Sequence, residues 1–84
     1  MDKEQAVDHF ISNVKLITDA DYGDFMRKSN TYFNRLLEHY PSPTEKEKEI
    51  LLKLKTKIQY DPDRNVDLTS LIAVDLAKSL KNKA

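Results

Sequence analysis

The sequence predicts an all-α protein, a compact bundle of three to four antiparallel helices in one domain, residues 1–84. Two observations lead to this fold class. The 84 residues include one glycine, Gly23, and three prolines, and alternating short strands would need more turn-forming residues than this. Four segments also place apolar residues every three or four positions, which is the spacing of one helix face.

The composition limits the classes of function. The chain has no cysteine, which excludes disulfides, a thiolate nucleophile and a cysteine-based zinc site. Its 14 basic residues balance its 14 acidic residues, whereas a general DNA-binding domain usually has a pI above about 9. Because no run is apolar enough to span a membrane and residues 1–20 lack a signal-peptide pattern, we expect a cytoplasmic protein with no membrane contact. Size and composition are typical of short bacterial and phage-encoded helical proteins.

The first two helices are predicted at about 3–17 and about 22–40. The apolar stripe of the first helix consists of Ala6, Val7, Phe10, Ile11, Val14 and Ile17. Thr18, Asp19 and Asp21 can each cap the second helix by accepting a hydrogen bond from its free N–H groups. The second stripe is the most regular in the chain and consists of Tyr22, Phe25, Met26, Ser29, Phe33, Leu36, Leu37 and Tyr40.

The third helix is predicted at about 43–60. Ser42 is the expected N-cap, with Pro43 at the first helical position and Glu45 completing a capping box. The residues expected in the core are Ile50, Leu51, Leu54 and Ile58. Residues 52–60 also alternate between apolar and polar side chains, as a strand does. The helix is favoured because a lone strand would have no partner for its backbone groups.

The last helix is predicted at about 68–82. Asp61, which precedes Pro62, is expected to end the third helix, and Asp67 is expected to cap the last one. The apolar residues of this helix lie on more than one face and are Leu68, Leu71, Ile72, Ala73, Val74, Leu76, Ala77 and Leu80. Such a helix is either central in a bundle or partly covered by something outside the chain.

Oxygen-bearing side chains occupy alternate positions before the last helix, as the ligands of a helix–loop–helix calcium site do; they are Asp61, Asp63, Asn65 and Asp67. Val66 stands where such a loop needs a glycine for its sharp turn. Ile72 stands where the loop needs a bidentate glutamate. We therefore expect no metal and no other cofactor, and these four residues are weak candidates for a degenerate calcium site.

Three other polar residues raise the question of a site. His9 and His39 have no histidine or carboxylate one helical turn away, so we expect both to be solvated rather than metal-bound. Asp75 lies one turn from apolar residues of the last helix. The favoured interpretation is contact with water or pairing with Lys78, and the alternative is that Asp75 faces a basic residue of a partner.

No glycine-rich phosphate loop and no hydrolase or metalloprotease motif occurs in the sequence, so we expect a protein that is not an enzyme. The favoured function is non-catalytic protein–protein interaction, as a regulator, adaptor, inhibitor or immunity-type protein that binds another protein or forms a homodimer through the last helix. The predicted interaction surface consists of Arg27, Lys28, Tyr32, Arg35, Leu71, Val74 and Asp75. The alternative is a nucleic-acid-associated regulator that uses the basic face of the second helix.

Overall fold

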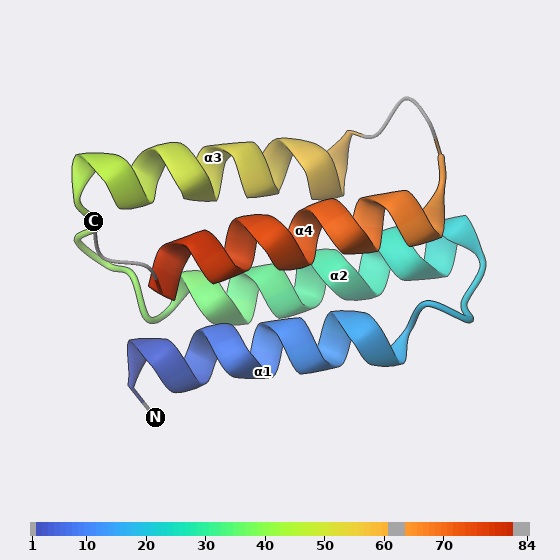
Figure 1. Ribbon diagram of the computed structural model, residues 1–84, viewed down its shortest axis with the longest axis horizontal. Coiled ribbons are helices and arrows are strands. Elements are labelled where there is room, and N and C mark those ends of the chain that lie inside the picture. The colour runs from blue at the N-terminus through green and yellow to red at the C-terminus, as the bar shows by residue number, and fades with distance from the viewer. Residues whose placement is uncertain (1, 61–63, 82–84) are drawn as a thin grey trace.

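Four antiparallel helices form the described part of the chain (Figure 1). The computed structural model describes residues 2–60 and 64–81. The helices are α1 (Lys3–Leu16), α2 (Tyr22–Leu37), α3 (Glu45–Gln59) and α4 (Val66–Lys81). Because the described residues include no strand, the all-α bundle is confirmed and the strand alternative for residues 52–60 is wrong.

The helices pack as a closed ring of four. α4 packs against α3 and α1, and α2 packs against the same two helices, so α2 and α4 lie on a diagonal of the bundle. Figure 1 accordingly shows α4 between α3 and α1. The radius of gyration is 11.9 Å, close to the roughly 12 Å expected for a compact domain of this length. None of the described helices combines the length and apolar character needed to cross a membrane.

The first two helices begin at aspartate caps. Asp2 Oδ1 accepts a hydrogen bond from the Gln5 N–H at 2.8 Å, and Gln5 Oε1 accepts one from the Asp2 N–H at 3.1 Å, which completes a capping box. Asp21, one of the three predicted candidates, caps α2 by accepting from the Asp24 N–H at 2.9 Å. The short aspartate side chains thus satisfy backbone donors that the helices leave without partners.

The predicted start of α3 is wrong by two residues. The N-cap is Thr44 rather than Ser42, and Thr44 forms a capping box with Glu47 at 3.1 and 2.9 Å. Ser42 with Glu45 and Thr44 with Glu47 both have the spacing of a capping box, so the spacing alone does not determine which residue is the N-cap. The same Glu47 side chain that completes the capping box with Thr44 also lies 3.7 Å from the Lys3 ammonium of α1.

The ends of α2 and α4 also differ from the prediction. α2 ends at Leu37 instead of residue 40, because the His39 and Tyr40 N–H groups bond to Leu36 and Leu37 in turns. The predicted cap Asp67 is wrong, since α4 begins at Val66. The predicted stop at Asp61 and Pro62 lies outside the described residues, and α3 ends at Gln59.

The core combines large side chains of α1 and α2 with a mostly small inner face on α4. Phe10, Phe25 and Phe33 are at most 2% exposed. The buried residues of α4 are Thr69, Ser70, Ala73, Val74, Ala77 and Leu80. Small residues on α4 leave room for the three rings at interior packing density. Of the two alternatives for the last helix, a central position does not fit, because α4 is one of four helices in a ring and packs on α3 and α1.

Among residues 2–60 and 64–81, one buried side-chain polar group lacks a hydrogen-bond partner. The Ser29 side chain is 1% exposed, and its Oγ has no hydrogen-bond partner in the structure. Burying a hydroxyl group without a hydrogen bond is unfavourable, and serine also has a lower helix propensity than alanine.

We expect Ser29→Ala to raise the free energy of unfolding by about 1 kcal/mol, because it removes the unsatisfied hydroxyl and keeps the packing. Urea denaturation followed by circular dichroism measures this change. The matched control is Ser79→Ala, whose hydroxyl donates to the Asp75 carbonyl at 3.2 Å, and the gain there is smaller. A loss of stability in Ser29→Ala would contradict the unsatisfied state of this hydroxyl.

Tyr40 lies at the junction of three helices. The ring is 5% exposed, and the Lys3 ammonium is 4.9 Å from its centroid. Burial raises the pKa of the Tyr40 hydroxyl, and the negative charge of Glu47 raises this pKa further. The pKa of Tyr40 is thus higher in the folded chain than its value of about 10 in the unfolded chain. Burial of the neutral ring therefore contributes its full stabilisation below about pH 10, and this stabilisation is lost as the pH rises through the folded pKa.

Tyr40→Phe should therefore reduce the loss of unfolding free energy between about pH 9 and pH 11. Part of the loss of unfolding free energy should remain in this variant, because the hydrogen bond that Lys81 donates to Asp8 raises the pKa of Lys81 as well. Denaturation curves across this pH range test the prediction. The control is Tyr60→Phe, at an exposed ring, and an identical pH profile for the two variants would contradict a role for Tyr40.

Candidate functional site

The predicted interaction surface is divided by the fold. Its members on α2 are Arg27, Lys28, Tyr32 and Arg35, and its members on α4 are Leu71, Val74 and Asp75. Because α2 and α4 lie on a diagonal and pack mainly on α1 and α3, the two sets do not form one continuous patch. The α2 set lies beside α1, and α4 lies beside α3.

On α2, the charged residues differ in their local partners. Arg27 Nη2 is 2.9 Å from Asp24 Oδ1 at the exposed surface. The hydrogen bond from Arg27 and then its positive charge lower the pKa of the Asp24 carboxyl. The Arg35 guanidinium lies 5.8 Å from the centroid of the Tyr32 ring, which is within the range of a cation–π contact.

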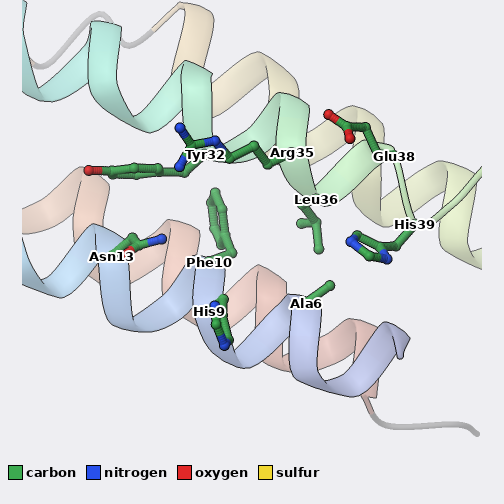
Figure 2. A pocket seen from close by; sticks show the side chains of 9 residues that line it. All are labelled: Ala6, His9, Phe10, Asn13, Tyr32, Arg35, Leu36, Glu38 and His39. Atoms are coloured by element: carbon green, nitrogen blue, oxygen red, sulfur yellow. The ribbon is translucent and has the colours of Figure 1, made fainter. Parts of the chain in front are cut away.

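Tyr32 and Arg35 line a cleft between α1 and α2 with a volume of about 430 Å³ (Figure 2). Its other lining residues are Ala6, His9, Phe10, Asn13, Leu36, Glu38 and His39. Figure 2 shows Phe10 and Leu36 pointing into the space between the helices. The cleft thus has an apolar floor and a rim of mixed charge.

The structure brings His9 and His39 to this one cleft, a relation that sequence reasoning missed. The one-turn spacing rule tests neighbours on a single helix, whereas His9 lies on α1 and His39 lies in the turn that follows α2. Within residues 2–60 and 64–81, no group of three histidine, cysteine, aspartate or glutamate residues is arranged to hold a metal.

On α4, the three predicted surface residues have different environments. Leu71 is 68% exposed and Asp75 is also exposed. Val74 is 6% exposed and belongs to the core, so its assignment to the interaction surface is corrected. Val74 lies one turn after Ser70 and three residues before Ala77, which places it on the inner face of the helix.

An open apolar groove lies between α3 and α4, with a volume of about 520 Å³. Its lining residues are Leu52, Lys53, Thr56, Lys57, Tyr60, Ile72 and Leu76. Leu52 and Tyr60 are 65% and 72% exposed. The sequence did contain a signal for this groove, because the helical interpretation of residues 43–60 leaves these two residues outside the predicted core.

The loop before α4 uses one of the weak metal candidates as a helix cap. Asn65 Oδ1 accepts a hydrogen bond from the Leu68 N–H at 3.0 Å, and the Asn65 carbonyl accepts one from Thr69 at 2.9 Å. Arg64 has a φ of 51°, which turns the chain into the helix. Asp67 lies within the first turn of α4, while Asp61 and Asp63 lie outside the described residues.

No protein-family model, no curated protein and no solved structure matches the chain. The concave surfaces of the chain include the α1–α2 cleft, which contains Tyr32 and Arg35 of the predicted surface, and the α3–α4 groove. A smaller hollow of about 150 Å³ contains Leu71 and Val74.

Asn65→Ala should lower the free energy of unfolding by about 1 kcal/mol, because the first turn of α4 loses its side-chain acceptor. Asp67→Ala should lower the free energy of unfolding by less, since Asp67 contributes only a favourable charge near the positive end of the helix. Urea denaturation of both variants decides the order. A larger loss for Asp67→Ala would contradict the position of the cap.

Proposed function

We propose that the chain is a small non-catalytic protein–protein interaction protein, a regulator or adaptor, and that it docks through the outer surface of α3 and α4. The observation that carries this proposal is the outward position of the large apolar side chains on these two helices. The residues that define this α3–α4 apolar face are Leu52, Thr56, Tyr60, Leu68, Ile72 and Leu76.

On α4, several apolar side chains keep part of their surface outside the core. The inner face includes Ala73 and Ala77, while Leu68 is 40% exposed and Ile72 and Leu76 are only partly buried. Removing apolar surface from water contributes about 25 cal/mol per Å². Covering this side of α4 with another polypeptide would therefore be favourable.

α3 continues the same apolar face. Leu52, Thr56 and Tyr60 follow one another at intervals of one helical turn, and the groove places them beside Ile72 and Leu76. Contiguous exposed apolar surface of this kind is typical of protein interaction sites rather than of the free surface of a monomer. A groove between two helices also suits the apolar side of a partner helix.

The charged residues of the groove support the same proposal. Lys53 and Lys57 line it, and the Lys53 ammonium is 3.4 Å from Glu49 at the exposed surface. Polar residues around an apolar centre are the usual arrangement of an interface that must also stay in solution.

We expect the double variant Leu52→Glu and Tyr60→Glu to lose partner binding, because two carboxylates would have to be buried in the contact. The measurement is affinity capture from a lysate of the source cells with the tagged chain, followed by mass spectrometry. Both substituted positions are exposed, so circular dichroism should show a bundle that unfolds at nearly the same temperature.

The matched control is Leu16→Glu, at a leucine of α1 that is 79% exposed and outside this face. The control should retain the same proteins as the unsubstituted chain. Equal capture by all three chains, or no protein captured by any of them, would count against the proposed function.

A further inference from the structure

We propose that the occupant of the α3–α4 apolar face is a second copy of this chain, related by a two-fold axis that runs along the groove. This inference rests on the proposed function, since it names the partner of the same face. It is carried by a charge pattern that is complementary to itself, by the extent of the face and by its apolar centre.

The first step is the height of the charged residues along the bundle. Leu52 of α3 and Leu76 of α4 line the same groove, and the two helices are antiparallel. Lys53 lies six residues before the end of α3, and Asp75 lies nine residues after the start of α4. Since each residue rises about 1.5 Å along a helix, Lys53 and Asp75 differ in height by only about 5 Å on these antiparallel neighbours.

The second step is the state of the Asp75 carboxylate. Asp75 is exposed, and no ion pair joins it to Lys78 or to any other residue in the described part of the chain. The Ser79 hydroxyl bonds to the backbone carbonyl of Asp75, at 3.2 Å, and not to its carboxylate. The carboxylate is therefore available to a cation from outside the chain.

The third step is the symmetry. A two-fold axis parallel to the helices, lying in the interface, places α3 of each copy over α4 of the other copy and leaves heights unchanged. Lys53 of each copy then faces Asp75 of the other and exchanges its exposed contact with Glu49 for this pair, so the dimer contains two equivalent ion pairs. Between them, Leu52 and Tyr60 of one copy cover Ile72 and Leu76 of the other.

The long side of the bundle that carries this face is of the size that a dimer interface needs. The bundle measures 33 × 24 × 19 Å, so one long side presents about 600–800 Å² in projection. A standard interface covers about 800 Å² per partner. One long side of the bundle therefore supplies an area close to that of a standard interface without any change of fold.

The test is the mass in solution of three chains across a concentration series, measured by sedimentation equilibrium. The unsubstituted chain should form a dimer of its 9.8 kDa monomer. Lys53→Glu and Asp75→Lys should each weaken dimerisation at least about tenfold, because each brings like charges together twice. Lys15→Glu, at an exposed lysine of α1, is the control and should dimerise as the unsubstituted chain does.

The decisive sample is an equimolar mixture of Lys53→Glu and Asp75→Lys. In a mixed dimer, each introduced carboxylate faces an introduced ammonium, and each unchanged Lys53 faces an unchanged Asp75, so dimerisation should return. A mixture that stays monomeric while the unsubstituted chain dimerises would overturn this arrangement, and so would single variants that dimerise normally.

A chain that is monomeric at every concentration would overturn the self-association. That result would leave the proposed function standing if capture of a different protein still depends on Leu52 and Tyr60. If neither dimerisation nor capture depends on these residues, both proposals fail.

Discussion

The packing of three phenylalanine rings into the same core as the small inner residues of α4 is the constraint on which the rest of the structure depends. Phe10, Phe25 and Phe33 are almost completely buried in a bundle of four short helices. An interior at crystal-like density has room for these rings only if another helix contributes little volume. α4 meets this condition with Ala73 and Ala77 at its buried positions.

This constraint determines which side of α4 faces solvent. A helix whose small residues face the core must carry its larger apolar residues elsewhere, and α4 carries Leu71 and Ile72 away from its inner face. The apolar surface that α4 exposes is thus a consequence of the small residues that it needs in the core. The polar contacts add little to this, because pairs such as Lys3–Glu47 and Lys81–Asp8 lie at least partly in solvent.

Much of the fold could be predicted from the sequence, because helix periodicity and caps are local. The number, order and approximate bounds of the helices followed from spacing alone. The start of α3 could not be predicted, since Ser42 and Thr44 both begin a capping-box pattern and only the structure shows that Thr44 is the N-cap. The start of α4 failed similarly, because asparagine and aspartate are equally good caps and the backbone turn at Arg64 is not encoded in spacing.

The candidate site was less accessible to sequence reasoning, because it depends on contacts between helices. The exposed positions of Leu71 and Asp75 agree with the predicted surface, but the core position of Val74 depends on how α4 is rotated against α1 and α3. The cleft that joins His9 to His39 and the groove that joins Leu52 to Leu76 both require knowing which helices are neighbours.

The division of roles on the α3–α4 apolar face follows from the energetics of its two components. Burial of leucine, isoleucine and tyrosine side chains is non-directional and supplies most of the affinity. An ion pair at an interface contributes more to orientation than to affinity. A two-fold axis perpendicular to the helices would bury the same apolar residues but would place α3 over α3, which separates Lys53 from Asp75. In the proposed dimer, the charges therefore select the axis parallel to the helices, and the apolar residues favour either arrangement.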